Sequence, residues 1–229
     1  MIDDRIVTIR VANNSNCSSR DFSIHEAILS EHSPYFRAAL DDKWRESSRI
    51  MELPFDEVDV VAAYIHWLYF KRVASKPISP PELPMDDGEY LTLARLYCFG
   101  EKVQDDAFCD DVMTAMTLKT DDIAEDGTRT FPSHSAVMAL YNGTTNHSVA
   151  RQFMVDMYCE FGMDQWIPKE AELNHPEFLA DLVHAFLGQK STVSHKQPNY
   201  PRRRTWHKRR QTQENVRLSS SNERLSSEV

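Results

Sequence analysis

HEAILSEHSPYF, residues 25–36, is the stretch of sequence that decides the fold. It predicts a helix over about residues 25–32, and Ser33-Pro34 predicts that this helix ends and that another begins. Proline is tolerated in the first turn of a helix, where its missing N–H would have no helical partner. The stretch is therefore expected to fold as two short helices that meet at Ser33.

The residue types in this helix pair predict structural roles. Ser33 is placed to cap the second helix, because its hydroxyl can accept a backbone N–H. Leu29 and Phe36 are expected in the core. We expect His25 to hydrogen-bond within the helix pair rather than to act as a ligand or a base. The stretch therefore predicts a packing unit and not a catalytic one.

Segments on either side of the helix pair predict strands. In the opening segment, apolar and polar residues alternate, as they do in a half-buried strand. The apolar ones are Val7, Ile9 and Val11. Phe22 and Ile24 alternate in the same way after the turn-forming residues 13–20, so the two segments predict a hairpin. Residues 49–53, closed by Pro54, predict a third short strand.

The rest of the ordered sequence predicts helices. Asp56 is expected to cap the first of them. Its apolar stripe is Val58, Val61, Ala62, Ile65, Leu68 and Tyr69. Two more follow, marked by Leu93, Leu96, Tyr97, Gly100 and Val103, and by Phe108, Val112, Ala115 and Met116. Further helices are expected at 134–141, 147–161 and 176–187, the last with a stripe of Phe178, Leu179, Leu182, Val183, Phe186 and Leu187. The order of two strands, a helix pair, a third strand and then helices predicts an α+β fold rather than an alternating α/β one.

The ordered set of segments resembles the BTB/POZ family over about residues 4–118. Residues 25–36 match the family pattern His-x-x-x-Leu-x-x-x-Ser-x-Tyr/Phe-Phe completely, with His25, Leu29, Ser33, Tyr35 and Phe36 in the named positions. Ile50–Leu53 resembles the third strand, Ala63–Tyr69 a helix end, and Leu93–Gln104 a further helix in a form associated with fungal members. The resemblance implies a BTB/POZ fold, a short three-stranded sheet flanked by helices, which serves protein–protein interaction and not catalysis.

Three regions are expected: a BTB/POZ-like domain over 1–118, a helical extension over 119–188 and a disordered basic tail over 189–229. The family's usual Tyr-Thr-Gly turn is here Tyr69-Phe70-Lys71, and a proline-rich loop follows it. Many dimeric members exchange a strand that precedes the first one, and almost nothing precedes it in this sequence. Homodimer formation is therefore left open.

The resemblance also implies a binding site for a cullin, the scaffold of a class of ubiquitin ligases. Family adaptors use a hydrophobic-x-acidic motif between the second helix and the third strand, where this chain has Trp44-Arg45-Glu46. An aromatic anchor in a pocket beside a carboxylate is typical of a binding hot spot. The alternative is that Trp44 only covers the edge of the helix pair.

Charge divides the chain into an acidic body and a basic tail. Residues 189–229 hold ten Lys and Arg against three Glu, a net charge of +7, and the remainder carries −16. The basic side chains gather in one run around Trp206: Arg202, Arg203, Arg204, Lys208, Arg209 and Arg210. This run is typical of a nuclear localisation signal read by an importin. There are two alternatives. The basic side chains could bind the phosphates of a nucleic acid while Trp206 stacks on a base, or the tail could be solvated and bind no partner.

Other functional classes find little support in the sequence. It contains no Gly-rich phosphate loop, no Gly-x-Ser-x-Gly and no His-Glu-x-x-His, so we expect neither an enzyme nor a cofactor. Its four cysteines are scattered, and Cys98 and Cys109 are expected as core thiols rather than zinc ligands. The sequence has no secretory signal and no apolar run near the roughly 20 residues that span a bilayer. We expect a protein of the nucleus or the cytoplasm.

Overall fold

A hairpin of two long strands forms the start of the fold. Strand β1 (Ile6–Asn13) pairs antiparallel with β2 (Ser18–His25), and Ile9 lies opposite Phe22. Strand β3 (Ile50–Leu53) joins the other edge of β1 in parallel, which gives the order β2-β1-β3. Alternate side chains of β1 are buried as predicted: Val7, Ile9 and Val11. The expected hairpin and third strand are confirmed.

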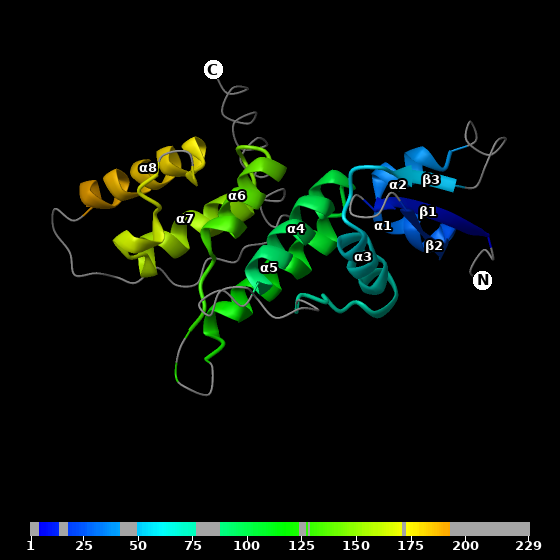
Figure 1. The fold of residues 1–229 in the computed structure, drawn as a ribbon, viewed down its shortest axis with the longest axis horizontal. Helices are drawn as coiled ribbons and strands as arrows, with labels where there is room; N and C mark the ends of the chain where they lie inside the picture. The colour runs from blue at the N-terminus through cyan, green and yellow to red at the C-terminus, as the bar shows by residue number, and fades with distance from the viewer. Residues whose placement is uncertain are drawn as a thin grey trace, which may run out of the picture.

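The computed structural model describes residues 5–13, 18–41, 50–76, 88–123, 127, 129–170 and 173–192. The sheet lies at one end of an elongated molecule, and the helices follow in chain order toward the other end (Figure 1). Two strands, a helix pair, a third strand and then a succession of helices confirm the α+β fold class. In the described ranges, no helix is both long and apolar enough to span a bilayer.

Helices α1 (Glu26–His32) and α3 (Val58–Phe70) pack beside the sheet, and α2 (Pro34–Ala39) packs on α1. The predicted cap of α3 is wrong, because Glu57 occupies the cap position and the Asp56 carboxylate pairs with Lys102 instead. The buried face of α3 is also rotated from the predicted stripe. It consists of Val60, Val61, Tyr64, Trp67 and Leu68. The large aromatic side chains of Tyr64 and Trp67 are buried and so determine which face of α3 points into the core, whereas Tyr69 stays partly exposed.

Tyr64 lies at the centre of an aromatic core shared by α2, α3, α4 (Glu89–Lys102) and α5 (Asp106–Asp121). Its ring contacts those of Phe36, Trp67, Phe99 and Phe108 at centroid distances of 5.0 to 6.2 Å. Its hydroxyl donates to the Asp105 carboxylate at 3.0 Å, and that carboxylate also accepts the Phe108 N–H to cap α5. The polar tip of a buried tyrosine is thus satisfied where two helices meet.

A second group of helices continues the fold: α6 (His134–Gly143), α7 (Val149–Phe161), a short 3-10 helix (Asp164–Trp166) and α8 (Pro176–Thr192). Helix α4 packs against α6, so the second group is continuous with the first. Of the predicted α8 stripe, Phe178 and Leu182 are buried and Leu179 is partly buried, whereas its other members remain exposed: Val183, Phe186 and Leu187. Helix α8 also extends to Thr192, four residues beyond the predicted boundary at 188.

The buried side chain of Arg151 connects the helices of this second group. It is only 5% exposed, and its guanidinium lies over the Tyr141 ring at 4.5 Å from the ring centre. It donates to the main-chain carbonyls of Tyr141 and Thr144 and to the Glu177 carboxylate at the start of α8. One side chain of α7 therefore holds the end of α6 and the beginning of α8.

Candidate partner-binding surface

The signature helix pair is held together by Ser33, which is fully buried between α1 and α2. Its hydroxyl accepts the Phe36 N–H at 3.1 Å and donates to the carbonyl of Val103 at the end of α4. Leu29 and Phe36 on either side are fully buried as well. The predicted cap and core positions are confirmed, and the bond to Val103 ties the pair to the rest of the domain.

Replacement of Ser33 by alanine is expected to lower the free energy of unfolding by about 2 kcal/mol. The change removes a helix cap and leaves the buried Val103 carbonyl without its donor, and both losses destabilise the fold. Urea unfolding measures the difference. Ser23, exposed on β2, supplies the matched control, and its replacement by alanine is expected to change stability by less than about 0.5 kcal/mol. Equal stability of the two variants would contradict this role of Ser33.

His25 is held by α3 and not within the helix pair, which corrects the prediction. Its ring nitrogen Nδ1 lies 2.7 Å from the Tyr69 hydroxyl, which also accepts the His25 backbone N–H at 3.2 Å. The two rings meet edge to face at 5.9 Å between centroids. His25 thus links the end of β2 to the end of α3 and has a structural role. Tyr69 is the partner that the sequence pattern did not reveal.

Tyr35 differs from the rest of the signature because it is 36% exposed. Its ring packs edge-on against Phe36, with centroids 5.2 Å apart, and its other side faces solvent. The neighbouring Arg37 donates to the carbonyls of Ser30 and Glu31 and so fastens α2 to the last turn of α1. Helix α2 is therefore tied to α1, and its outer surface carries a partly exposed aromatic ring.

The predicted cullin-binding residues, Trp44 and Glu46, lie outside the described residues. The structure describes the two ends of their segment. On one side, α2 ends at Ala39 and the chain is described through the exposed Asp41; on the other, β3 begins at Ile50. The motif therefore follows a helix that is capped and buried on its inner face and precedes a strand paired with β1.

The basic run of the tail also lies outside the described residues: Arg202, Arg203, Arg204, Lys208, Arg209 and Arg210. The proposed roles of these side chains in binding an importin or nucleic acid stay predictions. The last described element before them in the sequence is α8, which ends at Thr192.

Cys98 and Cys109 are thiols that pack against the core, as expected. Cys109 is fully buried, and burial raises the pKa of Cys98 to about 12, so its unreactive thiol form is favoured. Cys98 and Cys109 are not joined in a disulfide. Within the part of the chain that the structure describes, no group of three or more His, Cys, Asp or Glu side chains is arranged to hold a metal ion.

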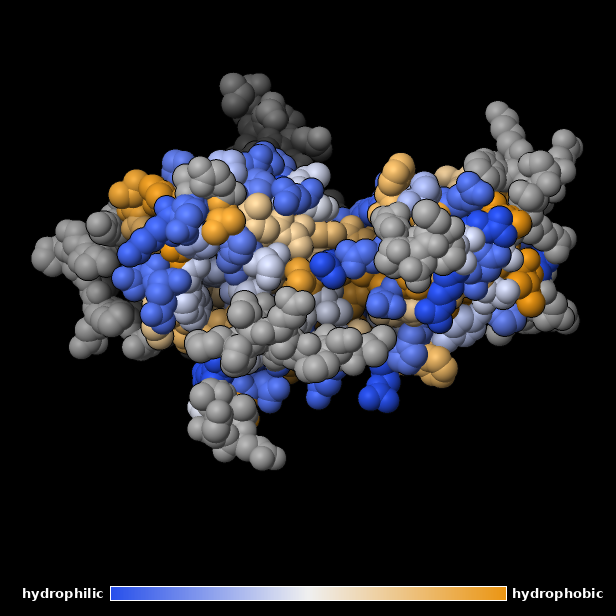
Figure 2. Space-filling model, in the orientation of Figure 1, coloured by the Kyte–Doolittle hydropathy of each residue, from blue (hydrophilic) through white to orange (hydrophobic). Residues whose placement is uncertain are grey.

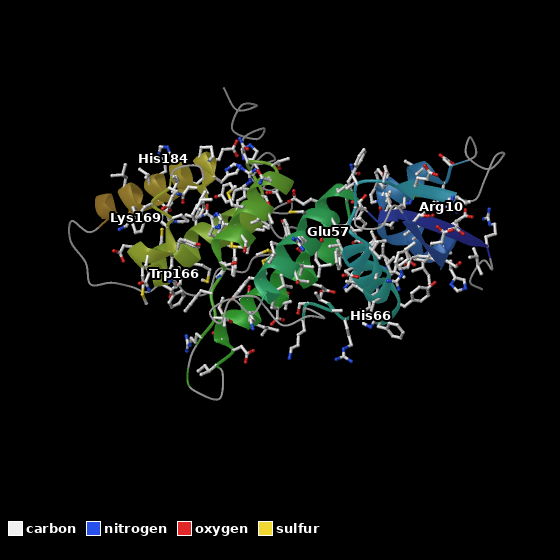
Figure 3. All side chains as sticks on the ribbon, in the orientation of Figure 1. Arg10, Glu57, His66, Trp166, Lys169 and His184 are labelled. Atoms are coloured by element: carbon white, nitrogen blue, oxygen red, sulfur yellow. The ribbon has the colours of Figure 1, made fainter. Side chains whose placement is uncertain are left out.

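A groove between α3, α4 and α6 is the surface feature that sequence reasoning missed. Its residues come from three separate segments, among them Phe55, Phe99 and Gly143. The available signal was Phe55, an aromatic residue in the turn after Pro54, where polar residues are usual. Figure 3 shows the labelled Glu57, which also lines the groove, near the junction of α3 and α4.

Comparisons with known proteins agree with the sheet and helix pair described above. A family model for the BTB/POZ domain matches residues 7–107. The chain is also similar to "TD and POZ domain-containing protein 3" of the mouse, with 24% identity over 188 residues. That alignment covers 80% of this chain but only 45% of the mouse protein, so the chain spans less than half the length of this relative.

The matched segment coincides with β1 to the start of α5, the part of the fold that contains the Ser33-capped helix pair and the three-stranded sheet. BTB/POZ domains form a non-enzymatic family of protein-interaction modules. Residues 7–107 of this chain are accordingly a BTB/POZ domain, a module that binds other proteins.

Proposed function

We propose that this chain is an adaptor or scaffold whose BTB/POZ domain docks a cullin of a ubiquitin ligase. The observation that carries the proposal is the signature helix pair, folded around Ser33 and leading directly into the segment with Trp44 and Glu46. Cullin binding is typical of adaptors with this domain. Trp44 would act as the aromatic anchor and Glu46 as a carboxylate that pairs or hydrogen-bonds beside it.

The fold around the motif favours this role. The inner face of α2 is buried through Phe36, and β3 is held in the sheet by β1, so both flanks of the segment are fixed. Fixed flanks lower the entropy that a binding loop loses when it docks. Helices α6 to α8 would extend the platform, since α6 packs directly on α4. Substrates would be bound elsewhere, by another segment or subunit.

The proposal is tested by titrating a purified cullin N-terminal domain into the full chain in a calorimeter. Saturable binding with one cullin for each chain is the expected result. Absence of heat at several temperatures, together with absence of a complex in size-exclusion chromatography, would exclude the adaptor function as stated.

A second candidate function is binding of nucleic acid, or of an importin, by the basic tail in the nucleus. The charge distribution favours it: the tail is positive, whereas the acidic body would repel a phosphate backbone. The six basic side chains between Arg202 and Arg210 flank Trp206, a combination that suits contact with phosphates and a stacked base.

Deletion of residues 193–229, which leaves α8 whole, distinguishes binding of nucleic acid by the tail from binding of an importin. If the tail binds duplex DNA, the affinity of the full chain should fall with salt with a log–log slope of up to about −5, because about six phosphates are neutralised. Fluorescence anisotropy with labelled DNA measures this slope, and the deletion should abolish binding. A cellular fusion that loses nuclear accumulation on deletion, without DNA affinity in either form, would assign the tail to an importin instead.

We also propose, from the form of Leu93–Gln104, that the chain is closest to fungal members of the family. The segment reads Leu-Ala-Arg-Leu-Tyr-Cys-Phe-Gly-Glu-Lys-Val-Gln and forms most of α4. A family tree built on the whole BTB/POZ domain tests the assignment, and grouping of this chain with animal members would overturn it.

A further inference from the structure

Helix α3 ends in a turn that presents aromatic rings and cations to solvent. Phe70 is 65% exposed and Tyr69 is 39% exposed, and Arg72 and Lys76 after them are exposed as well. Figure 3 labels His66 near the lower end of α3, and Figure 2 shows hydrophobic surface beside hydrophilic surface along this lower edge of the molecule. We call His66, Tyr69, Phe70 and Arg72 the α3-end patch.

Contacts link the members of this patch to one another and to the fold. The centroids of the His66 and Phe70 rings lie 4.8 Å apart. His66 Nδ1 lies 3.2 Å from the Arg72 carbonyl oxygen, and because a carbonyl only accepts, the nitrogen is the donor. The Tyr69 hydroxyl is bound to His25 at the end of β2. A partner that docks here therefore has fewer side chains to order.

Lys71, inside the turn, has a backbone conformation that favours glycine. Its φ is 53°, in the left-handed region, and its N–H donates to the Trp67 carbonyl in the last turn of α3. Its ammonium lies 4.1 Å from the centre of the Trp67 ring and 2.7 Å from His32 Nε2. These contacts offset the strain of a side chain at this position. Lys71 is thereby engaged within the fold, and Arg72 is the cation next to Phe70 that faces a partner.

The charge of this turn contrasts with that of the acidic body. The chain outside the basic tail carries −16, yet no Asp or Glu occurs between Asp59 and Glu82, whereas Lys71, Arg72 and Lys76 all do. Among the residues that the structure describes, no acid pairs with Arg72. A guanidinium beside an exposed aromatic ring suits a carboxylate on the cation and an apolar side chain on the ring.

We propose that the α3-end patch binds an acidic segment of a partner protein in which a carboxylate stands next to an apolar side chain. The carboxylate pairs with the Arg72 guanidinium, and the apolar side chain covers the Phe70 ring. A few carboxylates match the few cations of the turn. A nucleic acid instead brings a dense row of phosphates, which the −16 charge of the body repels. Charge complementarity therefore favours a peptide over a polynucleotide.

The α3-end patch is distinct from the proposed cullin contact. Neither Trp44 nor Glu46 belongs to it, since those residues follow α2 in the sequence and the patch is formed by the end of α3 and the turn after it. A chain that binds no cullin would still bind such a peptide. The BTB/POZ domain would thus hold a second protein at a surface of its own.

Fluorescence anisotropy with a labelled synthetic peptide, in which glutamate and phenylalanine alternate, tests the proposal on the full chain. Physiological ionic strength limits long-range attraction of the peptide to the basic tail. Saturable binding is expected, and Phe70→Asp/Arg72→Glu should weaken it at least about 30-fold, because the ring is lost and the charge is reversed. Phe55→Asp/Lys169→Glu is the matched control: it makes the same change in net charge at two exposed residues outside the patch and should bind like the wild type.

Arg72→Gln alone should weaken peptide binding at least about tenfold. It should leave the unfolding temperature unchanged because the side chain is exposed, which excludes misfolding as the cause. Absence of peptide binding by the wild type, or equal affinity of the two double variants, would overturn the proposal. Binding of labelled single-stranded DNA that is lost in Phe70→Asp/Arg72→Glu, without binding of the peptide, would also overturn it and would assign the patch to a nucleic acid.

Discussion

Replacement of Arg151 by methionine is expected to lower the free energy of unfolding by about 2–4 kcal/mol. The guanidinium is buried and has five acceptors: the carbonyls of Tyr141 and Thr144, the Thr144 hydroxyl, Asn146 and Glu177. Methionine fills much of the volume but donates to none of them. The carbonyls at the end of α6 would then lose their buried donor, and the start of α8 would lose its ion pair.

Denaturation with urea, followed by circular dichroism, measures this loss. Arg95→Met serves as the control because Arg95 is 45% exposed and pairs with Glu57 at the surface, so its removal should cost less than about 1 kcal/mol. Arg151→Lys is also informative, because one ammonium cannot reproduce the planar set of bonds and should still destabilise the fold. Equal stability of Arg151→Met and Arg95→Met would show that Arg151 does not fasten the second helical group.

The BTB/POZ half of the fold was predictable because its signals are local. Alternation in Val7, Ile9 and Val11 gave the first strand, and the Ser33-Pro34 pair gave the break and the cap within the helix pair. Each signal depends on neighbours in sequence, where backbone geometry and side-chain spacing dictate the outcome. The structure confirms them residue by residue.

Contacts between distant segments could not be predicted in the same way. Asp56 was expected as a cap, but Lys102 on α4 attracts its carboxylate, and the cap position falls to Glu57. His25 was expected to bond nearby, but the Tyr69 hydroxyl reaches it from α3. In both cases a partner more than forty positions away in the sequence decides the geometry.

In the second helical group, the role of Arg151 and the exposure of part of the α8 stripe also depend on contacts between distant segments, so the sequence could not predict them. Arg151 stands among apolar residues in Val149–Phe161, and its spacing does not distinguish a buried anchor from a solvated side chain. In α8, periodicity predicted one apolar stripe, yet Phe178 and Leu182 are buried while Val183 and Phe186 are exposed. Only the packing of α7 and α6 on α8 determines which part of the stripe is covered.

Substitution of both Trp44 and Glu46 by alanine is expected to weaken cullin binding about 100-fold or more, equivalent to about 2.7 kcal/mol. Aromatic anchors carry a large share of the energy of an interface, and an adjacent carboxylate contributes a charge-assisted hydrogen bond. The flanking α2 and β3 retain their own contacts, with Phe36 and Leu53 buried, so the fold should be unchanged. Unchanged urea unfolding of the variant would verify that.

Trp206→Ala/Glu214→Ala is the matched control, since it removes the same two residue types from the tail. It should bind a cullin like the wild type if the motif after α2 is the contact. Equal weakening by both double variants would show that loss of an aromatic and a carboxylate matters regardless of place, and the contact would have to be sought elsewhere.

Calorimetric titration of a cullin N-terminal domain into the wild type, Trp44→Ala/Glu46→Ala and Trp206→Ala/Glu214→Ala tests the adaptor function most directly. We predict saturable binding by the wild type and the tail variant, and about a 100-fold loss for the variant in the motif. Absence of binding by the wild type, or equal affinity of all three proteins, would contradict the proposed cullin contact.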